Sequence, residues 1–342
     1  MARTVQDREK HGVAVWGIGD HARRNLLPAI AGNPAIRLAG ITSRNRSVCE
    51  AQAETYGCRY WPDAERMLAD DAVDVVLIAT PTGLHFEHTG AALEAGKHVW
   101  CDKPLSQTYG EAETLVSLAS ERSRSLCTVF APPHHDQFRI LSGLLACDRV
   151  GPLRSLKAVF EIPHLEPDNF RYSRSSGGGA FLDMAIYPID ISVRLMGGLP
   201  ASISAEIESE DGFDVDTGGR AVLAFDGDRI AELRWGYGRP YANALTIAGS
   251  DGTITVERPF SKPPDFKGNI VIDHGPGIEE IIPVPACNQF SEMMTAFTKA
   301  IDESEIRSVF YGDALRQQKL LKQTKEAARA HLRNVESKLT VF

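Results

Sequence analysis

The sequence predicts an α/β domain with a doubly wound parallel sheet, followed by an α+β domain built on a mainly antiparallel sheet. Short apolar segments alternate with helical patterns as far as Phe130, which is typical of a parallel sheet covered on both faces. From His134 strands dominate, and turn signals such as Asp226-Gly227 indicate hairpins. The length of 342 residues suits two domains of about 150 residues each. We therefore place the first domain, which is predicted to bind a dinucleotide, at residues 1–131 and the second domain at residues 132–342.

The composition excludes several classes of partner. Hydrophobic content of 43% and charged content of 24% are ordinary for a globular protein. The net charge of −8 argues against nucleic acid. No apolar run approaches the ~20 residues of a membrane span, and the polar N-terminus lacks a signal region. The six cysteines have no C-x-x-C spacing, so we predict neither a metal site nor a disulfide framework, and reduced thiols fit the cytoplasm.

A glycine-rich turn follows the first predicted strand, Val13–Trp16. Residues Gly17 to Ala22 have the pattern G-x-G-x-x-A, the strand-to-helix turn that holds a dinucleotide pyrophosphate. Gly17 permits the tight turn, Gly19 lets the phosphate reach the backbone, and Ala22 keeps the helix near the strand. Backbone N–H groups at the helix start are the donors, and Pro28 should kink or shorten that helix. The predicted phosphate-binding residues are Gly17, Ile18, Gly19, Asp20, His21 and Ala22.

The end of the second predicted strand, Ile36–Ile41, indicates which dinucleotide is bound. Sites for NAD usually carry an acid about 20 residues past the glycines, where it binds the ribose 2′-hydroxyl. Here Ser43 and Arg44 stand at that position, and a guanidinium can pair with a 2′-phosphate instead. We therefore predict NADP, with NAD less favoured. The alternative is that Arg44 is an ordinary solvated loop residue.

Two further predicted strands end in loops that could hold a ligand, because ligands bind at the carboxyl ends of parallel strands. The strand Val73–Ala79 is followed by Thr80-Pro81, and His85 begins the next helix. His85 and His88 could form a metal pair, but no third ligand is nearby, so a histidine at a helix start is favoured.

The other elements predicted in this domain are helices at 47–56 and near 63–69, a capping box at Thr108 and Glu111 that opens a helix to about Glu121, and a strand at Leu126–Phe130.

The strand Lys97–Trp100 leads into Cys101-Asp102-Lys103-Pro104. A lysine at the carboxyl end of a parallel strand is well placed to meet a ligand there. The alternative is a surface lysine at a turn, which is the usual environment of lysine.

The second domain is predicted to contain a helix from His134 to about Cys147, a long loop with room for one hairpin at 258–286, and closing helices near 288–302 and 311–333. Its predicted strands are Leu153–Ile162, Ala201–Ser209, Ala221–Phe225, Ile230–Trp235, Ala244–Ile247 and Thr253–Val256.

One helix interrupts these strands and begins after the glycines of 177–179, which let another surface approach closely. Asp183 and Tyr187 are four residues apart, so they share one face of that helix. A carboxylate beside a phenol can orient a substrate and give it a proton. The alternative is a buried helix whose tyrosine hydroxyl has a structural partner.

These motifs in this order resemble the oxidoreductase family of glucose–fructose oxidoreductase and inositol dehydrogenase, over nearly the whole chain. The resemblance implies a Rossmann domain followed by a domain with a large open, mainly antiparallel sheet, which binds substrate and forms oligomers. It also implies that Lys103 is catalytic, and that Asp183 and Tyr187 are the substrate-site acid and the family's His or Tyr. Three residues depart from the family pattern: Asp102 replaces the usual glutamate, Ala185 a common glycine, and Ala22 the third glycine of the phosphate loop. None of these changes removes a catalytic group. The cofactor contacts predicted at the strand ends are Ala79, Thr80, Pro81, His85, Asp102 and Lys103.

Within the family, the segments Asn169–Tyr172 and Tyr241–Gly249 are similar to those of ketoreductases of nucleotide-linked deoxysugar biosynthesis. This implies reduction of a keto group on a sugar nucleotide, with Arg171 and Tyr172 also at the substrate. The alternatives are an NAD(P)-dependent sugar, polyol or dihydrodiol dehydrogenase, and a non-catalytic sensor that binds a dinucleotide. We also expect a homodimer or homotetramer that forms through the second domain's sheet, since an open sheet needs a cover.

The predicted mechanism is hydride transfer between a nicotinamide and a sugar ring carbon. Tyr187 is the predicted proton donor, Lys103 is predicted to favour its phenolate and bond the carbonyl oxygen, and Asp183 is predicted to fix a sugar hydroxyl. The presence of all three residues favours an enzyme over a sensor.

Overall fold

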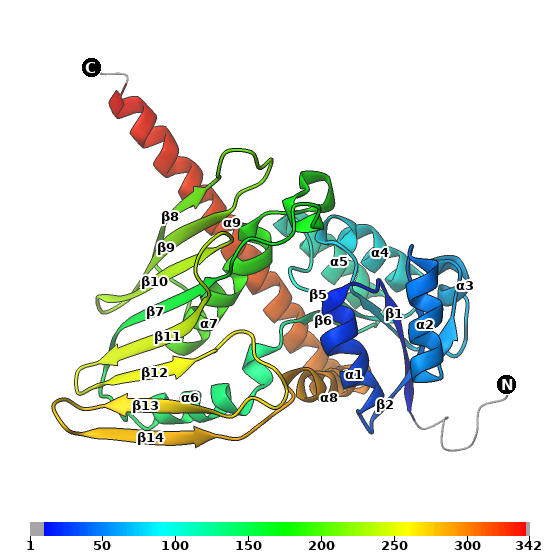
Figure 1. Cartoon of the computed structure of the whole chain (residues 1–342), viewed down its shortest axis with the longest axis horizontal. Helices are drawn as coiled ribbons and strands as arrows, with labels where there is room; N and C mark the ends of the chain where they lie inside the picture. The colour runs from blue at the N-terminus through cyan, green and yellow to red at the C-terminus, as the bar shows by residue number, and fades with distance from the viewer. Residues whose placement is uncertain (1–9, 340–342) are drawn as a thin grey trace. The chain divides into compact units, whose positions relative to one another are not determined.

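The computed structural model describes residues 10–339, with side chains described as far as residue 331. The chain divides into two compact units, coloured by residue number in Figure 1. The first consists of residues up to Phe130 together with Phe290–Gln318, and the second of Ala131–Gln289 together with residues from Lys319 on. Residues 290–318, which the sequence analysis assigned to the second domain, therefore group with the first unit.

Three contacts explain that grouping. The ring of Phe297 lies 5.6 Å from that of Trp100, centroid to centroid. The side chain of Asn33 donates to Thr295 at 2.9 Å, and the hydroxyl of Tyr311 donates to the Arg124 carbonyl.

The first unit is built on a six-stranded sheet in the order β3-β2-β1-β4-β5-β6, with every pair parallel in the described residues. This confirms the predicted doubly wound sheet. The order reverses between β1 and β4, and ligands bind at such a switch point. β3 was not predicted, because two residues are too short for a periodic signal. The strands are β1 (His11–Trp16), β2 (Ile36–Thr42), β3 (Arg59–Tyr60), β4 (Val75–Ile78), β5 (His98–Asp102) and β6 (Leu126–Val129).

The helix that contains Pro28 includes a π-helical turn, which the sequence did not predict. The helix runs without a break from Asp20 to Ala31, but Ala22–Leu26 is a π-helical turn directly before α1 (Leu27–Ala31). Proline has no N–H and its ring crowds the preceding turn, so a wider turn accommodates it. The other helices of this unit are α2 (Arg46–Tyr56), α3 (Ala64–Leu68), α4 (His85–Glu94), α5 (Tyr109–Glu121, with the predicted capping box), α8 (Gln289–Asp302) and the first part of α9 (Ser304–Leu339).

The second unit is built on an eight-stranded sheet in the order β14-β13-β12-β11-β7-β10-β9-β8. All pairs are antiparallel except β7 with β10, as the prediction of a mainly antiparallel sheet requires. The hairpin expected within 258–286 is β13 and β14. The strands are β7 (Leu153–Glu161), β8 (Ser202–Glu208), β9 (Gly218–Phe225), β10 (Arg229–Gly236), β11 (Ala242–Gly249), β12 (Thr253–Glu257), β13 (Gly268–Asp273) and β14 (Glu279–Val284); the unit's helices are α6 (Asp136–Ala146), α7 (Ile186–Met196) and the end of α9.

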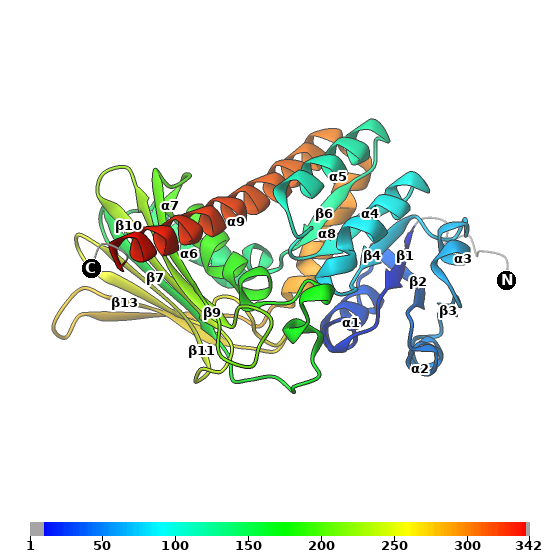
Figure 2. The same cartoon turned by 90° about the horizontal axis from the view of Figure 1, so that it is seen from above.

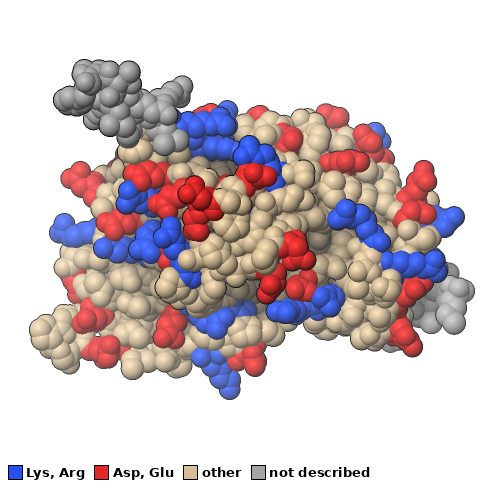
Figure 3. All heavy atoms as spheres, turned by 45° about the horizontal axis from the view of Figure 1, so that its top comes forward, with Lys and Arg blue, Asp and Glu red and all other residues tan. Residues whose placement is uncertain are grey.

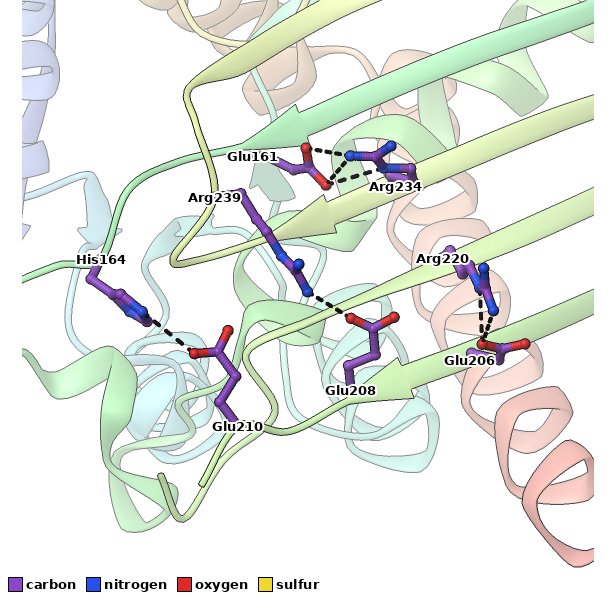
Figure 4. Close-up of polar contacts among 8 residues, drawn as sticks. All are labelled: Glu161, His164, Glu206, Glu208, Glu210, Arg220, Arg234 and Arg239. Carbon is purple, nitrogen blue, oxygen red and sulfur yellow. Dashed lines mark hydrogen bonds and ion pairs between the residues drawn. The ribbon is translucent and has the colours of Figure 1, made fainter. Parts of the chain in front are cut away.

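The two faces of this second sheet differ. Helix α7 packs on β7 and β10 and covers one side of the sheet, where Figure 2 shows it. The other side, here called the outer face, carries ion pairs between neighbouring strands, such as Glu161 with Arg234 and Glu206 with Arg220 (Figure 4). It also exposes Val222, 43% of whose surface is accessible.

In the described part of the chain, no helix combines the length and the hydropathy needed to cross a bilayer.

Candidate active site

The phosphate loop has the backbone that its glycines predict. Gly17 has φ +105°, and a Cβ there would lie 2.7 Å from the backbone of Ala79, so only glycine fits. Its N–H donates to the Thr42 carbonyl at 2.8 Å. A Cβ on Gly19 would meet nothing within 4 Å, so the space above that residue is open. A phosphate can therefore approach the start of the helix that begins at Asp20.

Arg44, which is predicted to bind the ribose 2′-phosphate, lies in an open recess at the start of α2. The recess is lined by Arg44, Asn45, Arg46, Ser47 and Glu50. The Asn45 side chain caps α2 by accepting from the Val48 N–H at 3.2 Å. The guanidinium of Arg44 and the positive end of the helix share this recess, and both favour an anion. The sequence analysis named Arg44 as part of this site but missed Arg46 and Ser47, which also line the recess. Asn45 could have indicated them, because an asparagine at this position marks the start of a helix.

His85 is buried between the loops that follow β4 and β5. Its Nε2 lies 2.8 Å from the Thr80 carbonyl oxygen and its Nδ1 lies 2.8 Å from that of Pro104. The neighbouring His88 contacts the same loop, since its Nδ1 lies 3.1 Å from the Thr80 hydroxyl. His85 is 1% exposed, so its ring lies beneath these loops and touches their backbone.

The side chain of Asp102 folds back toward the turn that contains Lys103. Its Oδ1 accepts from the Lys103 backbone N–H at 2.8 Å. Its Oδ2 lies 3.9 Å from Nε2 of His21, in the helix that follows the phosphate loop. The shorter acid at this position therefore orders the backbone of Lys103 and faces the predicted cofactor loop.

In the second unit, Asp216 holds the start of the helix that bears Asp183 and Tyr187. Its carbonyl accepts from the Ala180 N–H at 2.9 Å, and its Oδ2 accepts from the Phe181 N–H at 2.5 Å. Gly179 has φ +115°, and a Cβ there would lie 2.4 Å from Oδ1 of Asp216. This is the close approach predicted for the glycines. Burial raises the pKa of Asp216 to about 6, although the backbone N–H bonds oppose that shift.

Asp183 accepts two hydrogen bonds on the same oxygen. Nε of Arg171 donates to its Oδ2 at 2.8 Å, and the hydroxyl of the fully buried Tyr237 donates at 3.0 Å. Burial, followed by the Asp183 carboxylate, raises the pKa of Tyr237 well above its usual value, so Tyr237 remains a donor. The structure thus brings two predicted substrate residues, Arg171 and Asp183, together. Tyr237 was missed, because nothing in its local pattern marks it.

Tyr172 belongs to an adjacent aromatic cluster. Its hydroxyl accepts from the Leu165 N–H at 3.0 Å and lies 3.2 Å from Nδ1 of His164. Its ring packs at 4.6 Å from that of Phe213 and 5.7 Å from that of Tyr237. Tyr172 therefore borders the Asp183 site through Tyr237.

Tyr187 lies on the exposed side of its helix with Asp183. Of residues 181–190, only Leu182, Asp183 and Tyr187 are partly exposed. The Tyr187 ring meets Phe160 edge to face at 5.2 Å and Phe260 at 6.2 Å. Phe181–Ala185 forms a second π-helical turn, and such turns are frequent at functional sites. The predicted approach of Lys103 to Tyr187 joins residues of different units and stays a prediction.

Comparison with known proteins identifies the class. Residues 11–130 match the model of an oxidoreductase family with an NAD-binding Rossmann fold, GFO/IDH/MocA, and residues 138–255 match the C-terminal domain of the same family. The chain belongs to this oxidoreductase family.

Individual relatives match over nearly the full length. The chain is 32% identical to a dTDP-3,4-didehydro-2,6-dideoxy-alpha-D-glucose 3-reductase of Streptomyces violaceoruber, covering 92% of this chain and 95% of the relative. It is similar to KijD10, a 3-ketoreductase of Actinomadura kijaniata solved with NADP and TDP-benzene, with TM-score 0.88, 32% identity, and coverage of 93% of this chain and 98% of that one. It is also 26% identical to a NADP-dependent D-xylose 1-dehydrogenase of Haloferax volcanii, over 70% of this chain and 74% of that protein.

Proposed function

We propose that this protein uses NADPH to reduce a keto group on a ring carbon of a nucleotide-linked deoxysugar. The observation that carries the proposal is the likeness to sugar-nucleotide 3-reductases, which extends through both units. The recess beside Arg44 supports NADPH over NADH, because it presents a cation and a helix N-terminus where the 2′-phosphate would lie.

The residues divide the work as follows. The phosphate loop holds the diphosphate, and Arg44 holds the 2′-phosphate. When bound, NADPH supplies the hydride. Lys103 donates a hydrogen bond to the substrate carbonyl and stabilises the developing alkoxide. Tyr187 gives that oxygen its proton.

Asp183 accepts a hydrogen bond from a sugar hydroxyl and fixes the ring relative to Tyr187. Its own orientation is set by Arg171 and Tyr237, which both donate to Oδ2. A carboxylate held in one rotamer loses less entropy on binding, and so positions the substrate at lower cost.

The test uses the purified full chain, NADPH and a dTDP-linked 3-keto-deoxysugar, followed by nicotinamide absorbance, with the reduced carbon identified by NMR. We expect kcat/KM of at least about 10⁴ M⁻¹s⁻¹. Faster oxidation of free xylose or a polyol would favour the dehydrogenase alternative, which the Haloferax relative supports. Tight NADPH binding without turnover of either substrate class would favour a sensor.

We further propose that two copies associate through the outer face of the second unit's sheet. That face exposes Val222 beside ion pairs that already satisfy their own charges, so a second copy can cover it without leaving a charge unpaired. On the face drawn in Figure 3, acidic and basic side chains are interspersed, with no extended field of one sign that would attract a polyanion.

A further inference from the structure

The contacts of His85 constrain its protonation state. Each ring nitrogen lies 2.8 Å from a backbone carbonyl oxygen, Nδ1 from that of Pro104 and Nε2 from that of Thr80. Carbonyl oxygens only accept hydrogen bonds, and a neutral imidazole carries a single N–H. A neutral ring would therefore set one nitrogen lone pair against a carbonyl oxygen at hydrogen-bond distance, in a residue that is 1% exposed. Both bonds form only when the ring is an imidazolium.

The groups around the ring favour that charge. Burial disfavours the charged form, but Cys101 and Asp102 at the end of β5, together with the Pro104 carbonyl, raise the pKa of His85 to about 9. On its own helix, His88 faces it, and burial lowers the pKa of His88. The neighbouring histidine therefore adds no second positive charge near neutral pH.

The position of the ring gives the charge a role. Thr80 precedes Pro81 in the loop after β4, and Pro104 directly follows Lys103 in the turn after β5. The two strands are neighbours in the sheet, and beyond their ends the ring of His85 contacts the backbone of both turns.

We propose that His85 is a positioning residue, held as a buried imidazolium that ties the turn bearing Lys103 to the loop bearing Thr80 and Pro81. In this role the ring acts through the backbone of the two loops that it contacts, in place of the direct cofactor contact that the sequence predicts for it. Its proton fixes where the Lys103 backbone leaves the strand, and so where the ammonium of Lys103 can reach. The inference about Lys103 rests on the proposed reductase function, whereas the protonation state does not.

The first test is a measurement on the unmodified protein. Long-range ¹H–¹⁵N NMR of histidine-labelled full chain, titrated from pH 6 to 10, distinguishes an imidazolium from either neutral tautomer. We expect both His85 nitrogens to be protonated at pH 7. Near pH 9 the ring should lose one of these two protons, and the chemical shifts of both nitrogens should change together. His98 is the internal control: burial and Arg124 lower its pKa to about 4, so it should be neutral throughout. A neutral His85 at pH 7 would overturn the proposal.

The second test is the variant His85→Gln, whose amide can donate to one carbonyl and carries no charge. A displacement of a catalytic group by about 1 Å can cost 10²-fold in rate. We therefore expect kcat for the sugar nucleotide to fall by about 10- to 100-fold, with KM changed less than about twofold and NADPH affinity retained. His85→Asn provides a second variant if this one folds poorly. Parent-like kcat in a folded variant would show that the ring does not position Lys103. If the parent turns over no sugar nucleotide, the proposed function fails while the NMR result still decides the protonation state.

Discussion

Lys103 and Tyr187 are expected to act on the same charge as it develops in the transition state. Replacing Lys103 by Ala should lower kcat by about 10²–10⁴-fold, the range for an oxyanion donor or general acid. Tyr187→Phe should cost somewhat less, because water replaces a hydroxyl more easily than a fixed cation. Steady-state kinetics of both variants and of the double variant, with the sugar nucleotide, provide the measurement.

The double variant should be little worse than Lys103→Ala alone, since groups that act as a unit are not additive. NADPH affinity in Tyr187→Phe serves as the control and should match that of the parent. Near-normal turnover in Lys103→Ala would remove this residue from the proton path.

Arg44 is expected to decide cofactor preference. Arg44→Ala should weaken NADPH binding by about 1.5–3 kcal/mol, the usual value of a charge-assisted hydrogen bond, and leave NADH binding unchanged. Fluorescence titration with both cofactors measures this. Arg66→Ala is a matched control, because Arg66 is an exposed arginine of the same unit that pairs with Asp63 outside the recess. Equal affinities of the parent for NADPH and NADH would contradict the assignment.

At the level of elements, the start of the helix that carries Asp183 and Tyr187 should depend on pH through Asp216. Its pKa is raised from 3.8 to about 6, so the folded state favours the neutral acid. This preference adds about 3 kcal/mol to the free energy of unfolding. The contribution is fully present below the pKa that Asp216 has in the unfolded chain, and it is lost as the pH rises through about 6.

Asp216→Asn keeps an acceptor for the Phe181 N–H but cannot ionise. Urea unfolding of variant and parent gives the difference in their free energies of unfolding at each pH. This difference should favour the variant more at pH 7.5 than at pH 4.5, and titrations elsewhere in the chain cancel in it. An identical difference in unfolding free energy at the two pH values would show that the carboxyl does not titrate as described.

Local patterns predicted most elements, and the misses have physical causes. The capping box at Thr108 is readable because both its partners lie within four residues. The helix α9 begins at Ser304, earlier than the predicted 311, because its first turns are held by packing: Phe310 lies 5.0 Å from Phe297, and Arg307 donates to carbonyls of α8. The π-helical turns left no signal in the sequence beyond Pro28, which follows the first of them.

Candidate site residues could be named from the sequence where a motif marks them, but not where a distant residue supports them in the fold. The residues Gly17, Arg44, Lys103, Asp183 and Tyr187 followed from sequence patterns. Asp216 lies 37 residues from Gly179, and Tyr237 lies 54 from Asp183, so no periodicity links either pair. Only the folded backbone brings these partners together.

For the molecule as a whole, the outer sheet face predicts the oligomeric state. We expect a dimer or tetramer by multi-angle light scattering at micromolar concentration. Val222→Glu should lower the mass toward the monomer, because it buries an unpaired charge at the contact. Val309→Glu is the control, since Val309 is 62% exposed on α9 in the first unit and should leave the mass unchanged. A monomeric parent would contradict the proposal.

The division of α9 between the two units restricts how this protein can exchange parts with its relatives. The first unit consists of two separate stretches, and Trp100, which is fully buried, rests on Phe297 from the later one. A single crossover after Phe130 would join an incoming cofactor domain to helices α8 and α9 from a foreign parent. A functional chimaera should therefore need three junctions, after Phe130, Gln289 and Gln318, or else matched substitutions where the helices meet the sheet. Natural recombination that swaps cofactor preference in one step would have to retain Trp100 and Phe297 as a compatible pair.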